Sequence, residues 1–212
     1  MANYSLYFIA DNSFCDTNTL ITTVHQISDC GISLVQLRMK SAAKEEIIKT
    51  GEQLLKILRP KKIPLIINDQ PDVVAAIDAD GVHLGQNDID YEKARVQIGP
   101  HKIIGLSIEN LQQTHLCRHW NVDYFGVGPV FKTHSKLDAA KPIGLVGLKN
   151  IVSLSPKPVV AIGGINAQNA ADVLATGVSG VAVISAILAT KSPILAATQL
   201  NKIISDYQNQ HE

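Results

Sequence analysis

Short apolar runs alternate along this sequence with segments whose apolar residues recur at helical spacing. Eight runs carry the pattern, at Leu6–Ala10, Ser33–Leu37, Leu65–Ile67, Gly81–Leu84, Ile103–Leu106, Tyr124–Val127, Val159–Ile162 and Val181–Ile184. Amphipathic segments lie between them, at residues 44–58, 72–77, 91–98, 111–120, 145–154, 168–176 and 194–207. Continuous apolar strands that alternate with helices indicate a parallel sheet covered on both faces.

Eight strand–helix units in 212 residues favour a closed (β/α)8 barrel, the TIM barrel of the α/β class. We expect one barrel domain over residues 1–212. The alternative is an open doubly wound sheet, which typically carries G-x-G-x-x-G after its first strand. The first run is followed by Asp11-Asn12-Ser13, and the later Gly126-Val-Gly-Pro129 ends in a proline that has no amide hydrogen to offer a phosphate.

Charge and composition exclude several classes of partner. The chain has 19 Lys and Arg against 19 Asp and Glu, so no global positive field attracts nucleic acid or anionic lipid. The apolar stretch around residues 178–189 is shorter than the roughly 20 residues of a membrane span, and the N-terminus lacks the pattern of a signal peptide. We therefore expect a cytoplasmic protein with small-molecule substrates and no nucleic-acid or membrane partner. A homo-oligomer stays open.

Polar residues gather directly after the apolar runs, whereas the residues directly before the runs carry few functional side-chain groups. In a barrel, catalytic residues lie at the C-terminal ends of the strands. The residues in this position are Asp11, Arg38, Lys40, Asn68, Asp69, His83, Asp88, Ser107, Gly163, Gly164 and Ser185, with Thr133, Ser135 and Lys136 in the loop after the sixth run. This one-sided distribution predicts an active site at that end of the barrel.

The ends of the seventh and eighth runs predict a phosphate site. Gly163 and Gly164 let backbone amides approach a phosphate, and a short helix that begins near Ser185 adds the positive end of its dipole. The alternative is that the two glycines only make a tight turn. We expect Asn166 to cap the next helix.

Asp69 and Asp88 follow neighbouring strands, which lie about 4.8 Å apart in a sheet. Two carboxylates so placed can share Mg²⁺, which prefers oxygen ligands and keeps waters that a substrate phosphate can replace. The alternative is that each aspartate caps the helix that follows it. Arg38, Lys40 and Lys136 supply positive charge for a diphosphate. His83 ends a strand at the same face, where it either contacts substrate or is a hydrogen-bonded core histidine.

The motifs resemble those of the thiamine-phosphate synthase family over nearly the whole chain. They are Gln36-Leu-Arg-Met-Lys40, Ile67-Asn-Asp69, Asp80-Gly-Val-His-Leu-Gly-Gln-Asn-Asp88, Gly105-Leu-Ser107, Gly126-Val-Gly-Pro-Val-Phe131, Thr133-His-Ser-Lys136, Ala161-Ile-Gly-Gly-Ile165 and Gly180-Val-Ala-Val-Ile-Ser-Ala186. Ser135 departs from the usual threonine but keeps the hydroxyl. Met39, often acidic in relatives, is flanked by the retained Arg38 and Lys40.

The resemblance implies a transferase that joins 4-amino-2-methyl-5-(diphosphooxymethyl)pyrimidine to 4-methyl-5-(2-phosphooxyethyl)thiazole, or to its carboxylated form, with release of diphosphate. It implies pyrimidine diphosphate binding by Gln36, Arg38, Lys40, Asn68, His83, Ser107 and Lys136, and Mg²⁺ binding by Asp69 and Asp88. It implies thiazole phosphate binding by Thr133, Ser135, Gly164, Ile184 and Ser185. Lys136, Arg38 and Ser107 would stabilise the departing diphosphate.

Two rival functions are left open. A related thiazole tautomerase needs the phosphate cradle and an acid–base residue, but not the diphosphate-binding set. A catalytically silent barrel that only binds thiamine phosphate would need neither the carboxylates nor the cations. The presence of both groups in one sequence favours the synthase.

Overall fold

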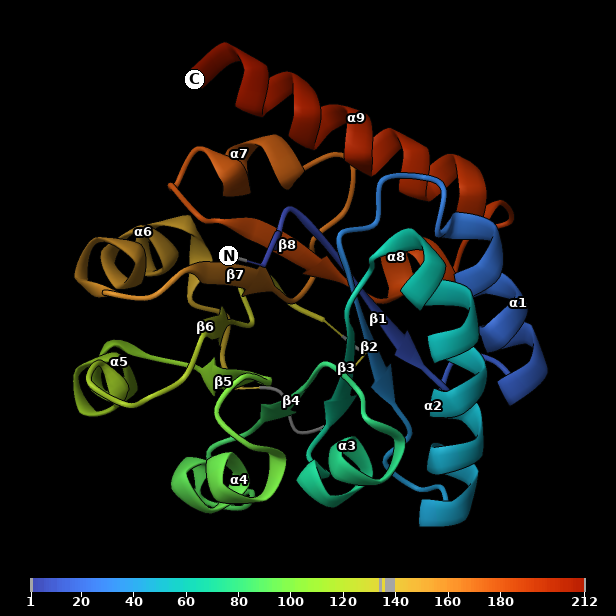
Figure 1. The fold of residues 1–212 in the computed structure, drawn as a ribbon. Helices are drawn as coiled ribbons and strands as arrows, with labels where there is room; N and C mark the ends of the chain where they lie inside the picture. The colour runs from blue at the N-terminus through green and yellow to red at the C-terminus, as the bar shows by residue number, and fades with distance from the viewer. Residues whose placement is uncertain (1, 134, 136–139, 212) are drawn as a thin grey trace.

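The computed structural model describes residues 2–133, 135 and 140–211 and has the shape of a closed barrel with helices around it (Figure 1). The strands are β1 (Leu6–Asp11), β2 (Leu34–Arg38), β3 (Leu65–Asn68), β4 (Gly81–Leu84), β5 (Ile103–Ile108), β6 (Tyr124–Val127), β7 (Val159–Ile162) and β8 (Gly180–Val183). All pairs are parallel, in chain order, and β8 pairs with β1 to close the barrel. The expected (β/α)8 barrel is confirmed.

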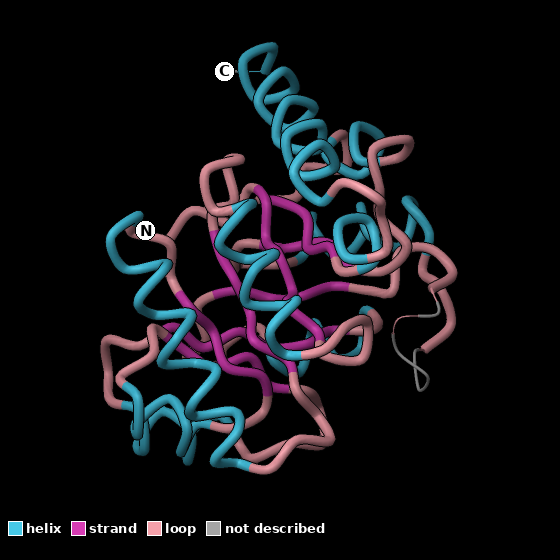
Figure 2. Tube along the Cα trace, turned by 90° about the vertical axis from the view of Figure 1, so that its right-hand side faces the viewer, coloured by secondary structure: helices cyan, strands magenta, loops and turns pink. Residues whose placement is uncertain are grey.

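The helices lie on the outside of the strands, as the side view shows (Figure 2). They are α1 (Thr17–Ile27), α2 (Lys44–Leu58), α3 (Pro71–Ile77), α4 (Tyr91–Ile98), α5 (Leu111–Cys117), α6 (Gly144–Leu154), α7 (Ala170–Leu174), α8 (Ser185–Leu188) and α9 (Pro193–His211), with a 3-10 turn, η1 (Arg59–Lys61), after α2. Within the described residues, no helix has both the length and the apolar character that crossing a membrane requires.

Helix α1 has no counterpart among the segments expected from the sequence. Asp16 caps it by accepting a hydrogen bond from the Thr19 amide at 3.0 Å. Leu20, Val24 and Ile27 make its buried face. That spacing of four and three residues after an aspartate is the signal that would have found it.

Side chains on each strand alternate between two cores. The larger core fills the space between strands and helices, and a smaller one fills the barrel interior. The interior core includes Tyr7 and Ile9 of β1, Ile66 of β3, Tyr124 of β6 and Val160 of β7. Because strand side chains alternate with a period of two, the residues further along the same inward rows emerge at the C-terminal mouth.

The turn after β7 departs from expectation in one detail. Asn166 does not cap α7; its side chain accepts a hydrogen bond from the Gln168 amide at 2.9 Å. Asn169 stands at the cap position, and its amide group donates to the Gly164 carbonyl at 2.9 Å. The later asparagine therefore holds the glycine turn to the start of the helix.

Candidate active site

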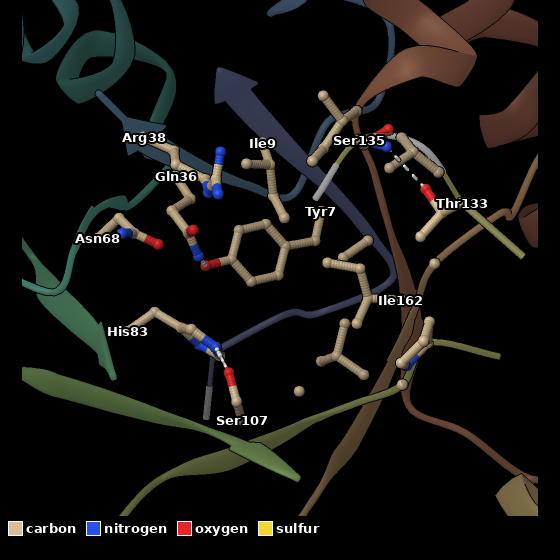
Figure 3. Close-up of a pocket in the computed structure, with 18 of the residues that line it drawn as sticks. Tyr7, Ile9, Gln36, Arg38, Asn68, His83, Ser107, Thr133, Ser135 and Ile162 are labelled. Atoms are coloured by element: carbon tan, nitrogen blue, oxygen red, sulfur yellow. Dashed lines mark hydrogen bonds between the residues drawn. The ribbon is translucent and has the colours of Figure 1, made fainter. Parts of the chain in front are cut away.

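A pocket occupies the C-terminal mouth of the barrel, where the sequence places the site. Every described residue expected to bind substrate or metal lines it: Gln36, Arg38, Lys40, Asn68, Asp69, His83, Asp88, Ser107, Thr133, Ser135, Gly164, Ile184 and Ser185. Lys136 lies outside the described residues. Gln36, Arg38 and Asn68 lie on one side of the pocket, and Thr133 and Ser135 lie on the other (Figure 3). The pocket thus has two polar ends.

The cationic end is fixed by Asp11, which the sequence places at this face without a role. Arg38 Nη1 pairs with Asp11 Oδ2, and the two residues are register neighbours on β2 and β1. Asp11 is 1% exposed, and its other oxygen accepts a hydrogen bond from the Ser13 amide at 2.9 Å. Asp11 therefore holds the guanidinium of Arg38, a residue that lines the pocket, at the rim.

The two expected metal-binding carboxylates come together beside Lys40. Lys40 Nζ lies 3.9 Å from Asp69 Oδ2, and the Asp69 amide donates to the His83 carbonyl at 2.9 Å. Burial, a hydrogen bond shared with Asp88 and the negative charge of Asp88 raise the pKa of Asp69 to about 6. Two carboxylates that share a proton disfavour ionising together, which is the situation that a divalent cation relieves.

Neither aspartate caps a helix, so that alternative is wrong. Gln70 precedes α3 without a side-chain cap, and Asp90 caps α4. Asp88 instead accepts a hydrogen bond from the Gly85 amide at 2.6 Å, which turns its carboxylate toward the pocket. Asp69 has a left-handed backbone, with φ of 62°. Aspartate is one of the few non-glycine residues that adopt this conformation readily.

The glycine pair after β7 lies under the loop that follows β6. Gly164 has φ of +67°, and a Cβ there would lie 2.8 Å from the Lys132 carbonyl oxygen. The Phe131 amide donates to the Gly163 carbonyl at 3.0 Å, which joins the two loops. Ser185 begins α8 at the mouth. The expected short helix is confirmed, and the glycine turn packs against the loop after β6.

His83 is both a pocket residue and a hydrogen-bonded one. Its Nε2 lies 3.0 Å from Ser107 Oγ, and its Nδ1 lies 2.9 Å from the Tyr124 hydroxyl. Tyr7 and Tyr124 line the floor of the pocket, although the sequence analysis did not single them out. The sequence feature that could have identified them is their position, because each lies on the inward-facing row of its strand.

The fold and this site define a class of protein: a (β/α)8-barrel enzyme with its pocket at the C-terminal mouth. A family model described as thiamine monophosphate synthase matches residues 6–187. The chain belongs to that family.

Related proteins align with this chain along most of their length. Thiamine-phosphate synthase of Clostridium novyi is 44% identical over 186 residues, which are 88% of this chain and 91% of that protein. The protein of the same name from Desulfitobacterium hafniense strain Y51 is 42% identical over 198 residues, 93% of this chain and 96% of its own.

A solved structure of the same family and a more distant one are both similar to this chain. Thiamine phosphate pyrophosphorylase from Pyrococcus furiosus superposes with a TM-score of 0.89 at 37% identity, covering 97% of this chain and 98% of that one. A 3-hexulose-6-phosphate synthase, at 16% identity and a TM-score of 0.73, covers 94% of this chain and 99% of its own. That second likeness concerns the fold alone.

Proposed function

We propose that residues 1–212 work as one barrel domain that joins the pyrimidine diphosphate to the thiazole phosphate, giving thiamine phosphate and diphosphate. The observation that carries the proposal is that the pocket at the mouth has two polar ends. One end has cations and paired carboxylates, and the other has hydroxyls and a glycine turn. Two phosphorylated substrates that must meet at one carbon need such an arrangement.

The diphosphate binds at the end formed by β2, β3 and β4. Arg38, held by Asp11, offers a guanidinium fork to phosphate oxygens, and Lys40 adds a second positive charge. Gln36, Asn68, His83 and Ser107 contact the pyrimidine and the first phosphate. Lys136, which lies outside the described residues, is proposed to meet the charge on the departing diphosphate.

Asp69 and Asp88 suit Mg²⁺ when diphosphate is present. Among the described residues, no group of three or more His, Cys, Asp or Glu side chains gathers to hold a metal. Two carboxylates leave the other positions to water and substrate oxygens, as Mg²⁺ prefers. Burial and the neighbouring Asp88 raise the pKa of Asp69 although Lys40 lies 3.9 Å away, so a further positive charge would favour the ionised pair. When bound, the ion would neutralise charge on the diphosphate.

The thiazole phosphate binds at the opposite end. Thr133 and Ser135 supply hydroxyls, and the Ser135 amide donates to Thr133 Oγ1 at 3.2 Å, so the two are already held together. Gly164, Ile184 and Ser185 bring backbone amides from the ends of β7 and β8. Helix N-termini and glycine turns at this place are typical phosphate sites of barrels.

The reaction needs no protein nucleophile. The C–O bond to diphosphate breaks with its electron pair leaving on oxygen, while the pyrimidine amino group releases electrons to the carbocation-like methylene carbon. The thiazole nitrogen then donates its lone pair to that carbon. The chain stabilises the leaving charge through Arg38, Lys136 and Ser107, and it holds both rings in register. Ile9, Val160 and Ile162 add apolar surface to the pocket lining, against which the two rings can pack.

The test is a thiamine phosphate assay with each substrate alone and with both, with and without EDTA. We expect product only when both substrates are present, and we expect EDTA to abolish it. Conversion of the exocyclic thiazole carboxylate phosphate to its aromatic tautomer, without metal and without thiamine phosphate formation, would overturn the proposal in favour of the tautomerase. Tight binding of thiamine phosphate with neither reaction would identify a silent barrel.

A further inference from the structure

A chain of hydrogen bonds crosses the barrel interior beneath the pocket. Gln36 Nε2 donates to the Tyr7 hydroxyl at 2.7 Å, and the Tyr7 and Tyr124 hydroxyl oxygens lie 2.9 Å apart. The Tyr124 hydroxyl lies 2.9 Å from His83 Nδ1, and His83 Nε2 lies 3.0 Å from Ser107 Oγ. Gln36, Tyr7, His83 and Ser107 are labelled in Figure 3, at one end of the pocket floor. The five side chains come from five strands.

The middle of this chain is buried. Gln36 is 3% exposed, Tyr7 is 2% exposed and Tyr124 is fully buried. Burial raises the pKa of both tyrosines above the ordinary value, so each phenol keeps its hydrogen. Each hydroxyl therefore has one hydrogen to donate and must find an acceptor inside the protein.

These constraints fix the direction of donation. Tyr7 accepts from Gln36, so its own hydrogen goes to the Tyr124 oxygen, and the Tyr124 hydrogen goes to His83 Nδ1. In the reverse direction Tyr7 would accept from both neighbours, and its hydrogen would have no acceptor among the described residues. A buried donor without an acceptor costs free energy, so the first direction is favoured.

The direction has a consequence at the pocket. If Nδ1 of His83 accepts, the ring hydrogen of the neutral imidazole is on Nε2 and is donated to Ser107 Oγ. Ser107 then accepts from His83 and keeps its own hydrogen for an acceptor in the pocket that it lines. A phosphate oxygen is such an acceptor.

Two glycines make room for this arrangement. A Cβ on Gly105 would lie 2.3 Å from the Tyr124 hydroxyl oxygen and 2.5 Å from His83 Nδ1. A Cβ on Gly126 would lie 2.8 Å from His83 Cε1. Neither glycine has a positive φ, so space is the requirement at both positions. The absence of side chains there gives independent support for a built hydrogen-bonded chain.

We infer that Tyr124 is a positioning residue that fixes His83 as the Nε2–H tautomer and thereby makes Ser107 a hydrogen-bond donor to the diphosphate substrate. Tyr124 touches no reacting atom; it acts through His83. The part that concerns the substrate rests on the proposed function. The part that concerns the tautomer does not, because it describes the protein without ligand.

The first test is the tautomer of His83 in the ligand-free protein. Long-range ¹H–¹⁵N correlation spectra above the ordinary histidine pKa distinguish Nδ1–H from Nε2–H, and the His83→Gln spectrum identifies the signals. We expect Nε2–H in the wild type and a mixture in Tyr124→Phe. Nδ1–H in the wild type, or an unchanged tautomer in Tyr124→Phe, would overturn the inference.

Tyr4→Phe is the matched control. The Tyr4 ring packs 4.9 Å from the Tyr124 ring in the same interior core, but its hydroxyl lies outside the hydrogen-bonded chain. Like Tyr124→Phe, the Tyr4→Phe variant removes one hydroxyl from a buried tyrosine. We expect its His83 signals to match those of the wild type. A tautomer shift in Tyr4→Phe equal to that in Tyr124→Phe would mean that general loosening of the core is responsible.

The second test is a double-mutant cycle with Ser107→Ala. We expect Tyr124→Phe to lower kcat/KM for the pyrimidine diphosphate about tenfold, the size of one hydrogen bond to a charged group, and to leave KM for the thiazole phosphate unchanged. In the Ser107→Ala background the same change should have almost no effect. Additive effects would overturn the inference. A wild type without synthase activity would instead contradict the proposed function, while the spectra still decide the tautomer.

Discussion

Asp11 and Arg38 form a buried ion pair between the C-terminal ends of β1 and β2, at the point where the cationic end of the pocket begins. The Arg38 side chain is 14% exposed and that of Asp11 is 1% exposed. Breaking one side of a buried pair leaves the other charge without compensation. The pair therefore links the stability of the barrel rim to the orientation of a substrate-binding cation.

Asp11→Asn should lower both stability and activity. We expect the free energy of unfolding to fall by about 2–4 kcal/mol, because the Arg38 charge stays buried without its partner. We expect kcat/KM for the pyrimidine diphosphate to fall about tenfold, since the guanidinium is no longer held. Urea denaturation and steady-state kinetics measure the two effects. Asp206→Asn, which removes the exposed pair with Lys202, is the control and should change unfolding by less than about 1 kcal/mol.

Asp69→Asn should stabilise the protein without metal while it abolishes activity. The folded-state pKa of about 6 lies above the ordinary 3.8, so the folded protein binds this proton more tightly than the unfolded chain. Stability from this group is therefore present at low pH and is lost as pH rises through that window. The neutral amide avoids the loss. We expect a gain on the order of 1–3 kcal/mol above pH 6 in EDTA, and none near pH 4.

Asp78→Asn is the matched control for that experiment. Both aspartates have a left-handed backbone, with φ of 62° and 55°, and asparagine tolerates this conformation as well. Lys102 lowers the pKa of Asp78 through a hydrogen bond and its charge. Asp78→Asn should therefore give no gain at any pH. A melting temperature that rises equally in both variants would contradict the role of the Asp69–Asp88 pair.

Gly164→Ala should weaken thiazole phosphate binding and destabilise the fold. The new methyl group would lie 2.8 Å from the Lys132 carbonyl oxygen and from Phe131 Cβ. Gly144→Ala is the control, because Gly144 has nearly the same φ, +65°, with nothing within 4 Å of the added carbon. We expect Gly164→Ala to cost about 1–3 kcal/mol more than the control. KM for the thiazole phosphate should rise only in Gly164→Ala; equal kinetics in the two variants would refute the crowding argument.

Lys136→Ala should lower turnover by about 10²–10³, comparable to removal of one preorganised donor that stabilises developing charge. Single-turnover experiments with both substrates measure the chemical step. Lys141→Ala removes an exposed lysine nearby in the sequence and should stay close to the wild type. If Lys136→Ala also stays within a few-fold of the wild type, Lys136 has no part in diphosphate departure.

The sequence predicted the strands closely because buried parallel strands have a simple signature. Seven of the eight expected runs differ from the observed strands by at most one residue at either end, and the eighth, β5, extends two residues further, to Ile108. β1 and β3 continue into the polar residues Asp11 and Asn68, where apolar character no longer marks the strand. Helix α1 was not expected, because Thr23 interrupts its otherwise apolar buried face.

Which polar residues would share one pocket also followed from the sequence, since the ends of parallel strands in a barrel meet at one mouth. Strand order alone places Asp69 near Asp88, and Arg38 and Lys40 stand together at the end of one strand. What the residue pattern left open was the choice between capping and metal binding. The structure excludes capping by Asp69 and Asp88, because Gln70 and Asp90 occupy the N-cap positions of α3 and α4.

The sequence by itself determined the alternation of strands and helices, the closed barrel and the set of polar residues at its mouth, because each depends on local periodicity and on a fixed chain direction. Only the tertiary structure decided which buried groups pair. Asp11 meets Arg38 through the register of β1 and β2, and Tyr124 reaches His83 across the space that Gly105 leaves. Register and space are set by the closure of the whole barrel, which no local stretch of sequence encodes.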